Sequence, residues 1–367
     1  MATGQPTDAD AEPASVAGTP LFDRFLERIG IDRLVTANSS SRDWSPLVGY
    51  ALLVAFVEVV ALQAYNLWVG RGVVFAANPL WLVRPLLLVG AAVATQLLHE
   101  RYDRAVARSN LRARAADPER FEGLVPDWLL GGIIAVGVAF TVLNAVVILT
   151  IPQIYAAGGP ARVVRFLVVT PVGYVPVFGS FLATYISVEM LLPRTLSKSD
   201  VGLDFLDPER LGGMRPIGEL VKFAYYLLMV GLVGQAVATY GPYLLEGVFA
   251  YEALEPPGAA INAAFTAVWA AAVLTMAYGI YTLHHYMVRE KQEALHRLDT
   301  RAREHIDDPW DITRVDVSDP PGEYEAYRSR VEHVTSTREY PATFTMWSQL
   351  AVGVMIPKAI QFVLAAA

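Results

Sequence analysis

One long apolar stretch decides the fold. Residues 163–189 read VVRFLVVTPVGYVPVFGSFLATYISVE, in which apolar side chains follow one another with very little charge. The hydrocarbon core of a bilayer is about 30 Å thick, and a helix of roughly 20 apolar residues crosses it. The stretch therefore predicts a transmembrane helix.

The composition of the whole chain agrees with a location in the lipid bilayer. Of its 367 residues, 54% are hydrophobic and only 18% are charged, less charge than a soluble domain of this size carries. Cysteine is absent, which excludes disulfides, iron–sulfur clusters and cysteine nucleophiles. The net charge of −7 argues against a nucleic-acid partner, which would need a concentrated basic face.

Six stretches meet the same criterion of length and hydropathy, so we predict an all-α, polytopic transmembrane helical bundle within residues 47–286. A further stretch, 344–366, is either a seventh span kinked at Pro357 or a re-entrant segment. The six predicted spans are residues 47–69, 79–98, 128–152, 163–189, 219–242 and 259–286.

Basic residues alternate sharply between the two sides of the predicted membrane. The segment before the first span holds 4 Lys and Arg, and the connections 98–127, 190–218 and 287–343 hold 6, 4 and 9. The opposite side has only Arg71 and Arg162. By the positive-inside rule, the N-terminus is cytoplasmic in the cell membrane, and short outer loops lie at 70–78, 153–162 and 243–258.

The segments outside the spans divide into four parts. Residues 1–20 are acidic and rich in Ala, Pro and Thr, as in a disordered tail, and 21–46 contain an amphipathic stretch suited to the inner membrane face. Residues 287–343 predict a cytoplasmic helical hairpin, whose helices either contact only each other or bind a partner protein. Residues 344–367 form the C-terminal membrane segment.

Within the opening stretch, TPVGYVPVFGS at 170–180 contains a VGY like that of a potassium filter. A filter needs a continuous T-V-G-Y-G, and here a proline interrupts the motif and its last glycine is missing, so a filter is not predicted. Two interpretations remain open, a kinked helix packed against its neighbours and a broken helix lining a cavity. The residues on which both depend are Pro171, Gly173, Pro176 and Gly179.

Charged side chains inside the spans are costly and therefore mark candidate functional sites. Glu58 lies 12 positions past Pro46, roughly 18 Å along a helix. Lys358 lies 14 positions past Phe344, so its depth matches that of Glu58 if the last segment enters from the cytoplasm. Arg84 and Arg165, in the outer parts of the second and fourth spans, could reach toward Glu58 instead. The alternatives are a buried ion pair that fixes helix register, and a positive pocket for an anion or for proton coupling through Glu58.

No catalytic or cofactor-binding motif occurs in the sequence. A Walker loop, a G-x-S-x-G elbow and a Rossmann glycine run are all missing, and the six histidines show no metal-binding spacing. The sequence therefore predicts no cofactor, no metal and no enzymatic activity.

The loop DPERLGGMRPIG at 207–218 is similar to the H-P-D-x-x-G-G-L-x-x-L-G loop of a group of uncharacterised multi-pass prokaryotic membrane proteins. Pro208, Gly212 and Gly213 match, whereas Asp207 replaces the histidine and Glu209 the aspartate. The segment after His284 and the closing YPATFTMW and IPKAIQFVL also resemble that group. The resemblance implies a shared topology, with a polar linker before the last segment, and no particular activity.

Two classes of function fit these features. The first is a channel or transporter for a small solute or ion, built on residues 170–180 with Glu58, Arg84, Arg165 and Lys358. The second is a membrane scaffold or sensor that acts through the cytoplasmic hairpin. We favour transport, because intramembrane charge requires an explanation and a helical hairpin does not.

The predicted orientation can be tested by single-cysteine labelling, because the chain has no native cysteine. In intact cells, a membrane-impermeant maleimide should label Gly72→Cys in the first outer loop. It should label Asp117→Cys, in the basic 98–127 connection, only after the membrane is permeabilised. The reverse pattern would show that the N-terminus is external.

Overall fold

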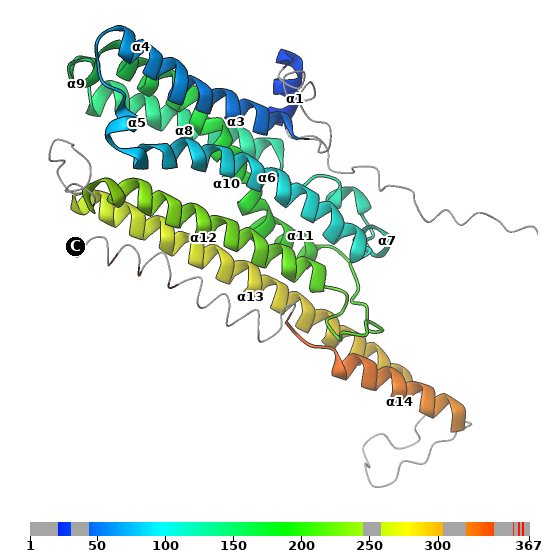
Figure 1. Cartoon of the computed structure of the whole chain (residues 1–367). Helices are drawn as coiled ribbons and strands as arrows, with labels where there is room; N and C mark the ends of the chain where they lie inside the picture. The colour runs from blue at the N-terminus through cyan, green and yellow to red at the C-terminus, as the bar shows by residue number, and fades with distance from the viewer. Residues whose placement is uncertain are drawn as a thin grey trace, which may run out of the picture.

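The computed structural model describes residues 21–30, 44–244, 258–303 and 321–340, with the isolated positions 355, 359 and 362. Every regular element in these ranges is helical, as predicted (Figure 1). The acidic tail 1–20, most of the outer loop 243–258, and Lys358 with most of the segment 344–366 lie outside the described residues.

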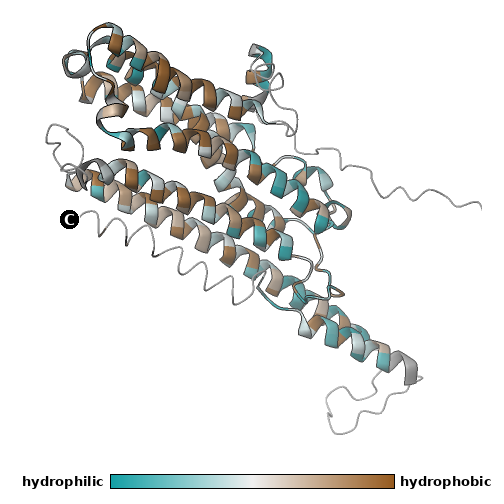
Figure 2. Cartoon of the chain, in the orientation of Figure 1, coloured by the Kyte–Doolittle hydropathy of each residue, from teal (hydrophilic) through white to brown (hydrophobic). Residues whose placement is uncertain are grey.

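Among the described residues, six helical segments are long and apolar enough to cross a membrane, which agrees with the six predicted spans. Apolar residues dominate the long helices, and hydrophilic ones gather toward one end of the bundle (Figure 2). The first three spans are α3 (Pro46–Phe56) with η1 (Val57–Ala61) and α4 (Leu62–Trp68), η2 (Pro79–Leu82) with α6 (Val83–Arg108), and α8 (Asp127–Leu143) with η4 (Asn144–Ile148).

The fourth span is composite and the last two are single helices. The fourth runs over Gly158–Lys198 and combines the end of α9 (Ile151–Val164) with η5 (Arg165–Tyr174), α10 (Val175–Ile186), η6 (Ser187–Leu191) and α11 (Leu192–Lys198), and the others lie in α12 (Arg215–Leu244) and α13 (Ala259–Arg303). The remaining elements are α1 (Leu21–Ile29), α5 (Val74–Ala77), α7 (Leu111–Arg114), η3 (Pro118–Phe121) and α14 (Pro321–Ser336).

Helix α6 lies at the centre of the bundle, where it contacts α3, α10 and α12. Helix α8 covers α10 on one side, and α13 packs against η6 and α11 on the other. On α8, large apolar side chains such as Val136 and Phe140 are mostly exposed. In water such a face would be unfavourable, but facing lipid it needs no protein cover.

The fourth span differs at its start from the prediction. The outer loop expected at 153–162 is helical, because α9 begins directly after Thr150. The chain turns instead at two points, Thr150 with φ of 53° and Gly159 with φ of 66° and ψ of −160°. A glycine adopts such a conformation without strain, and Pro160 is pre-set to start the next helical turn. The apolar 149–157 segment masks both turns in a hydropathy profile.

The sequence DPER occurs twice, at 117–120 and at 207–210, and the two copies fold differently. The first forms η3, with Asp117 before it. The second forms a turn in which the Asp207 carboxylate accepts N–H hydrogen bonds from Glu209, Leu211 and Gly213 at 2.9–3.1 Å. Partial burial raises the pKa of Asp207, but these donors outweigh it and lower that pKa below its ordinary value. The Asp207 side chain therefore stabilises the backbone of its own loop, residues 207–218.

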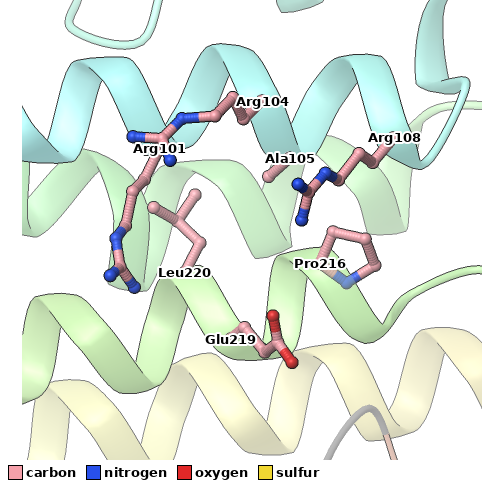
Figure 3. Close-up of a pocket in the computed structure, with 7 residues that line it drawn as sticks. All are labelled: Arg101, Arg104, Ala105, Arg108, Pro216, Glu219 and Leu220. Carbon is pink, nitrogen blue, oxygen red and sulfur yellow. The ribbon is translucent and has the colours of Figure 1, made fainter.

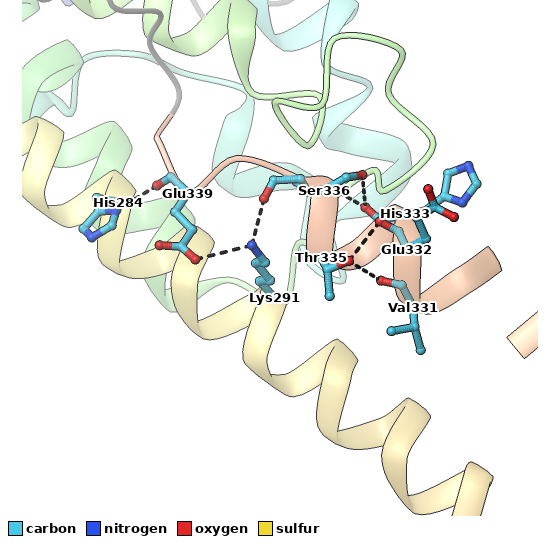
Figure 4. A network of polar contacts seen from close by, with 9 residues as sticks. His284, Lys291, Val331, Glu332, His333, Thr335, Ser336 and Glu339 are labelled. Carbon is cyan, nitrogen blue, oxygen red and sulfur yellow. Dashed lines mark hydrogen bonds and ion pairs between the residues drawn. The ribbon is translucent and has the colours of Figure 1, made fainter. Parts of the chain in front are cut away.

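A long arm continues from the sixth span. Helix α13 contains 45 residues, roughly 67 Å at the usual helical rise, so it extends well past a bilayer core. Helix α14 packs beside its end, and the chain after α14 is tied back to α13 (Figure 4). Lys291 Nζ donates to the Thr337 carbonyl at 2.9 Å, and His284 Nδ1 lies 2.8 Å from the Glu339 carbonyl.

Helix α13 approaches the backbone of η6 closely at Gly279. A Cβ built on Gly279 would lie 2.3 Å from the main-chain oxygen of Glu189, which cannot move without displacing the helix. Gly279→Ala should therefore lower the unfolding free energy by about 1–3 kcal/mol, the usual cost of overpacking. Thermal unfolding in detergent would measure the change.

The matched control is Gly231→Ala in α12, where a Cβ would meet nothing within 4 Å. There the better helix propensity of alanine should leave stability equal or raised by up to about 1 kcal/mol. Equal behaviour of the two variants would contradict the close crossing.

Candidate functional site

Glu58, predicted as the main intramembrane charge, lies at a buried junction of the first and fourth spans. Its side chain is 2% exposed and projects from the π-helical turn η1. Arg165 Nη2 lies 2.6 Å from Glu58 Oε1, and the Tyr174 hydroxyl donates a hydrogen bond to Oε2. Both carboxylate oxygens therefore face a partner supplied by η5.

Arg84 belongs to the same cluster through an aromatic ring. Its guanidinium carbon lies 4.8 Å from the centre of the Trp81 ring, and that of Arg165 lies 6.0 Å from the same ring. The Trp81 ring thus offers a cation–π contact to both guanidinium groups. Of the four predicted charges, the structure brings Glu58, Arg84 and Arg165 together, and Lys358 lies outside the described residues.

The segment 170–180 stays helical through both prolines, which differs from the predicted cavity-lining break. Residues 165–174 adopt the wider π-helix, and the Val175 N–H bonds to the Thr170 carbonyl. Pro176 has no N–H for the Val172 carbonyl, and the Tyr50 hydroxyl donates to that carbonyl at 2.6 Å instead. A neighbouring side chain thus satisfies the acceptor that the proline leaves open.

The two predicted glycines serve close packing. A Cβ on Gly173 would lie 2.6 Å from Val54 Cγ1 of α3, and one on Gly179 would lie 3.1 Å from Ile134 Cγ1 of α8. Pro171 is buried in the same contact with the first span. The structure therefore favours the first of the two open interpretations, an irregular helix packed tightly against its neighbours.

A second buried carboxylate, Glu189, was not among the predicted site residues. It is 0% exposed in the π-helical turn η6, and neither of its oxygens accepts a hydrogen bond from a described residue. It also forms no ion pair within the part of the chain that the structure describes. Glu189 therefore differs fundamentally from Glu58.

The surroundings of Glu189 come from α12 and α13 and are mainly apolar. Its Oε2 is 3.3 Å from the position that a Cβ of Gly279 would occupy, so the carboxyl group rests against α13. Glu189 interacts electrostatically with the hydroxyls of Tyr185 and Tyr225. Tyr185 donates to the Ala272 carbonyl at 3.3 Å, whereas the buried Tyr225 hydroxyl has no hydrogen-bond partner among the described residues.

An isolated carboxylate in such a place is expensive as an anion, so it is stable when it holds a proton or a cation. The arrangement can therefore take up and release a positive charge. Sequence reasoning missed Glu189 because it stood at the predicted end of the span, where carboxylates reach water. In the structure the helix continues to Lys198, and α13 covers the position.

Within the described ranges, the fold is helical with six segments long and apolar enough to span a membrane, and the carboxylates of Glu58 and Glu189 are buried among them. Comparison with protein-family models, curated proteins and solved structures finds no match to this chain. Its function is therefore argued from the two sites alone.

A double-mutant cycle should show that the Glu58–Arg165 ion pair, called the clasp below, stabilises the contact between the first and fourth spans. Arg165→Met leaves a buried carboxylate without its cation and should cost about 3 kcal/mol of unfolding free energy. The double variant Glu58→Gln/Arg165→Met should regain more than half of that loss, because no lone charge remains. Unfolding in mixed micelles of increasing denaturing detergent would give the three values.

Arg24→Met provides the control, since Arg24 pairs with Asp127 at 2.8 Å while both side chains are about half exposed. An exposed pair contributes only about 0–1 kcal/mol. A double variant at Glu58 and Arg165 that is as unstable as Arg165→Met alone would contradict the clasp.

Proposed function

We propose that this protein transports a proton or a small monovalent cation across the cell membrane, and that Glu189 is the group that takes it up. The observation that carries the proposal is a fully buried carboxyl group in a membrane-spanning helix with no compensating partner among the described residues. Membrane proteins retain such groups chiefly where charge must be bound and released.

Glu58 supports the proposal by contrast. Its charge is balanced by Arg165 and its second oxygen is occupied by Tyr174, so the clasp has no need of an outside ion. Two carboxylates at comparable burial thus have opposite surroundings. We assign Glu58 to holding the first and fourth spans together and Glu189 to ion uptake.

The local backbone fits a site that exchanges charge. Glu189 lies in a π-helical turn, a geometry that occurs often at functional sites because it alters the direction of side chains. Tyr185 and Tyr225 can donate a hydrogen bond to the carboxylate when it is charged, and accept one from it when it is neutral.

In the proposed step a proton bonds to one Glu189 oxygen from one side of the membrane and leaves from that oxygen toward the other side. The carboxylate is restored, and no bond of the protein changes. By the distribution of basic residues, we place the N-terminus and the α13–α14 arm in the cytoplasm.

The second candidate function, a scaffold or sensor, is favoured by the arm. Helix α14 packs against α13, and the chain just after α14 is joined to α13 by the ion pair between Lys291 and Glu339 at 3.3 Å and the stacked rings of His284 and Tyr340. This projection would suit a protein partner. It does not explain an unpaired carboxyl group within the bundle.

Proteoliposomes would test transport by Glu189. The purified full chain is reconstituted with a pH-sensitive dye inside, and a potassium gradient with valinomycin sets the membrane potential. Wild type should acidify the lumen, or admit sodium in the matched sodium assay. Glu189→Gln should fall to the rate of empty liposomes, because an amide binds no proton in this range.

Glu290→Gln is the matched control, since Glu290 is also buried but pairs with Arg289 on the arm at 3.1 Å. It should retain the wild-type rate, as should a chain in which α14 is replaced by a flexible linker. Equal flux in Glu189→Gln and wild type would reject the assignment. Loss of flux on replacing α14 would favour the scaffold or sensor.

A further inference from the structure

A basic cavity lies between two spans at the end of the bundle that carries most of the charge. It has a volume of about 200 Å³, and its walls come from the last turns of α6 and the first turns of α12. Figure 3 shows Arg101 and Arg108 extending from α6 toward α12, above Pro216 and Glu219. Arg101, Arg104 and Arg108 follow one face of α6, because positions three and four apart are neighbours on a helix.

The three arginines are only partly neutralised. Arg104 pairs with Glu100 of its own helix at 3.6 Å, while Arg108 forms no ion pair with any described residue. The carboxylate of Glu219, the only acidic group in the wall, is already bound by Arg215 at 2.9 Å. The cavity therefore has a net positive charge that the described part of the protein does not balance.

By the predicted ends of the spans, we place the cavity at the depth of the lipid headgroups. Arg101 is three residues past Leu98, where the second predicted span ends, and Glu219 is the first residue of the fifth. The Arg101 guanidinium lies 3.5 Å from the centre of the Phe223 ring, so a charged group rests on an aromatic ring there. Leu220 and Ala105 line the floor, which gives the cavity an apolar side and a cationic side.

We infer that this cavity binds the phosphodiester headgroup of an anionic phospholipid, with Arg101 and Arg108 as the principal ligands. The planar guanidinium fork matches two phosphate oxygens at once, which a point charge does not. Basic pockets between spans on the cytoplasmic side are suited to such headgroups, and the cytoplasmic leaflet is the anionic one. A second basic cavity, lined by Arg120, Arg194 and Lys198, opens at the same end.

Native mass spectrometry of the full chain, titrated with phosphatidylglycerol or with phosphatidylcholine of the same acyl chains, would test this inference. Wild type should prefer phosphatidylglycerol. Arg101→Gln/Arg108→Gln should lose roughly 30-fold in affinity for it and keep its affinity for phosphatidylcholine, given a usual contribution of about 1 kcal/mol from each basic residue. Size-exclusion profile and thermal midpoint would show that the variant is folded.

Arg297→Gln/Arg301→Gln removes the same charge from the exposed arm and should bind phosphatidylglycerol as wild type does. An equal loss in this control pair would assign the binding to general surface charge and overturn the inference, as would unchanged binding in Arg101→Gln/Arg108→Gln. A titration with inorganic phosphate alone distinguishes a lipid headgroup from free phosphate as the source of the bound anion. Millimolar phosphate could raise the thermal midpoint of wild type and leave that of Arg101→Gln/Arg108→Gln unchanged. If wild type also showed no preference for phosphatidylglycerol, the ligand of the cavity would be free phosphate and not a lipid.

These outcomes are independent of ion flux. If the cavity variant loses its lipid preference but still takes up protons, the assignment of Glu189 to ion uptake is unaffected. If Glu189→Gln loses proton uptake but keeps its lipid preference, the assignment of the cavity to lipid binding is unaffected.

Discussion

A helix within a bilayer has no water to satisfy its backbone, so each carbonyl and N–H must find its partner inside the protein. The fourth span meets this constraint under difficult conditions, because two prolines remove two donors within six positions. Widening of residues 165–174 to π-helical bonding changes the pattern of donors, and Tyr50 of the first span serves the Val172 carbonyl. The irregular sequence is thereby accommodated without unwinding.

The same solution ties the first and fourth spans together. Tyr50 and Glu58 lie in the first span, and both bond to residues 165–174 of the fourth. Gly173 lets α3 approach closely enough for these bonds to form, since a Cβ there would meet Val54 at 2.6 Å. Gly173, Pro176 and the Glu58–Arg165 ion pair thus belong to one interface between the first and fourth spans. A change in any one of them would alter the conditions under which the others are stable.

The six spans followed from hydropathy and spacing, and the cost of buried charge singled out Glu58, with Arg165 as one of three cations within its reach. Each of these quantities depends on one segment of the chain and can therefore be calculated from the sequence. The remaining features are tertiary. Glu189 is buried because α13 crosses at Gly279, and the turn at Gly159 lies in an apolar run that hydropathy reads as continuous. Neither crossing angles nor a change from α to π bonding leaves a periodic signal along the chain.

The unusual length of α13 gives the bundle a mechanical property. Its packing in the bundle continues past Gly279 to Leu283, Tyr286 and Met287, which are buried in the apolar core, and the remainder of the helix, to Arg303, forms the arm. From Met287 to Arg303 the helix covers 16 rises, or roughly 24 Å, so a tilt of about 5° where α13 leaves the core would displace the tip of the arm by about 2 Å. The length of the arm thus turns a small reorientation of α13 at the core into a displacement that a partner protein or a spectroscopic probe could register.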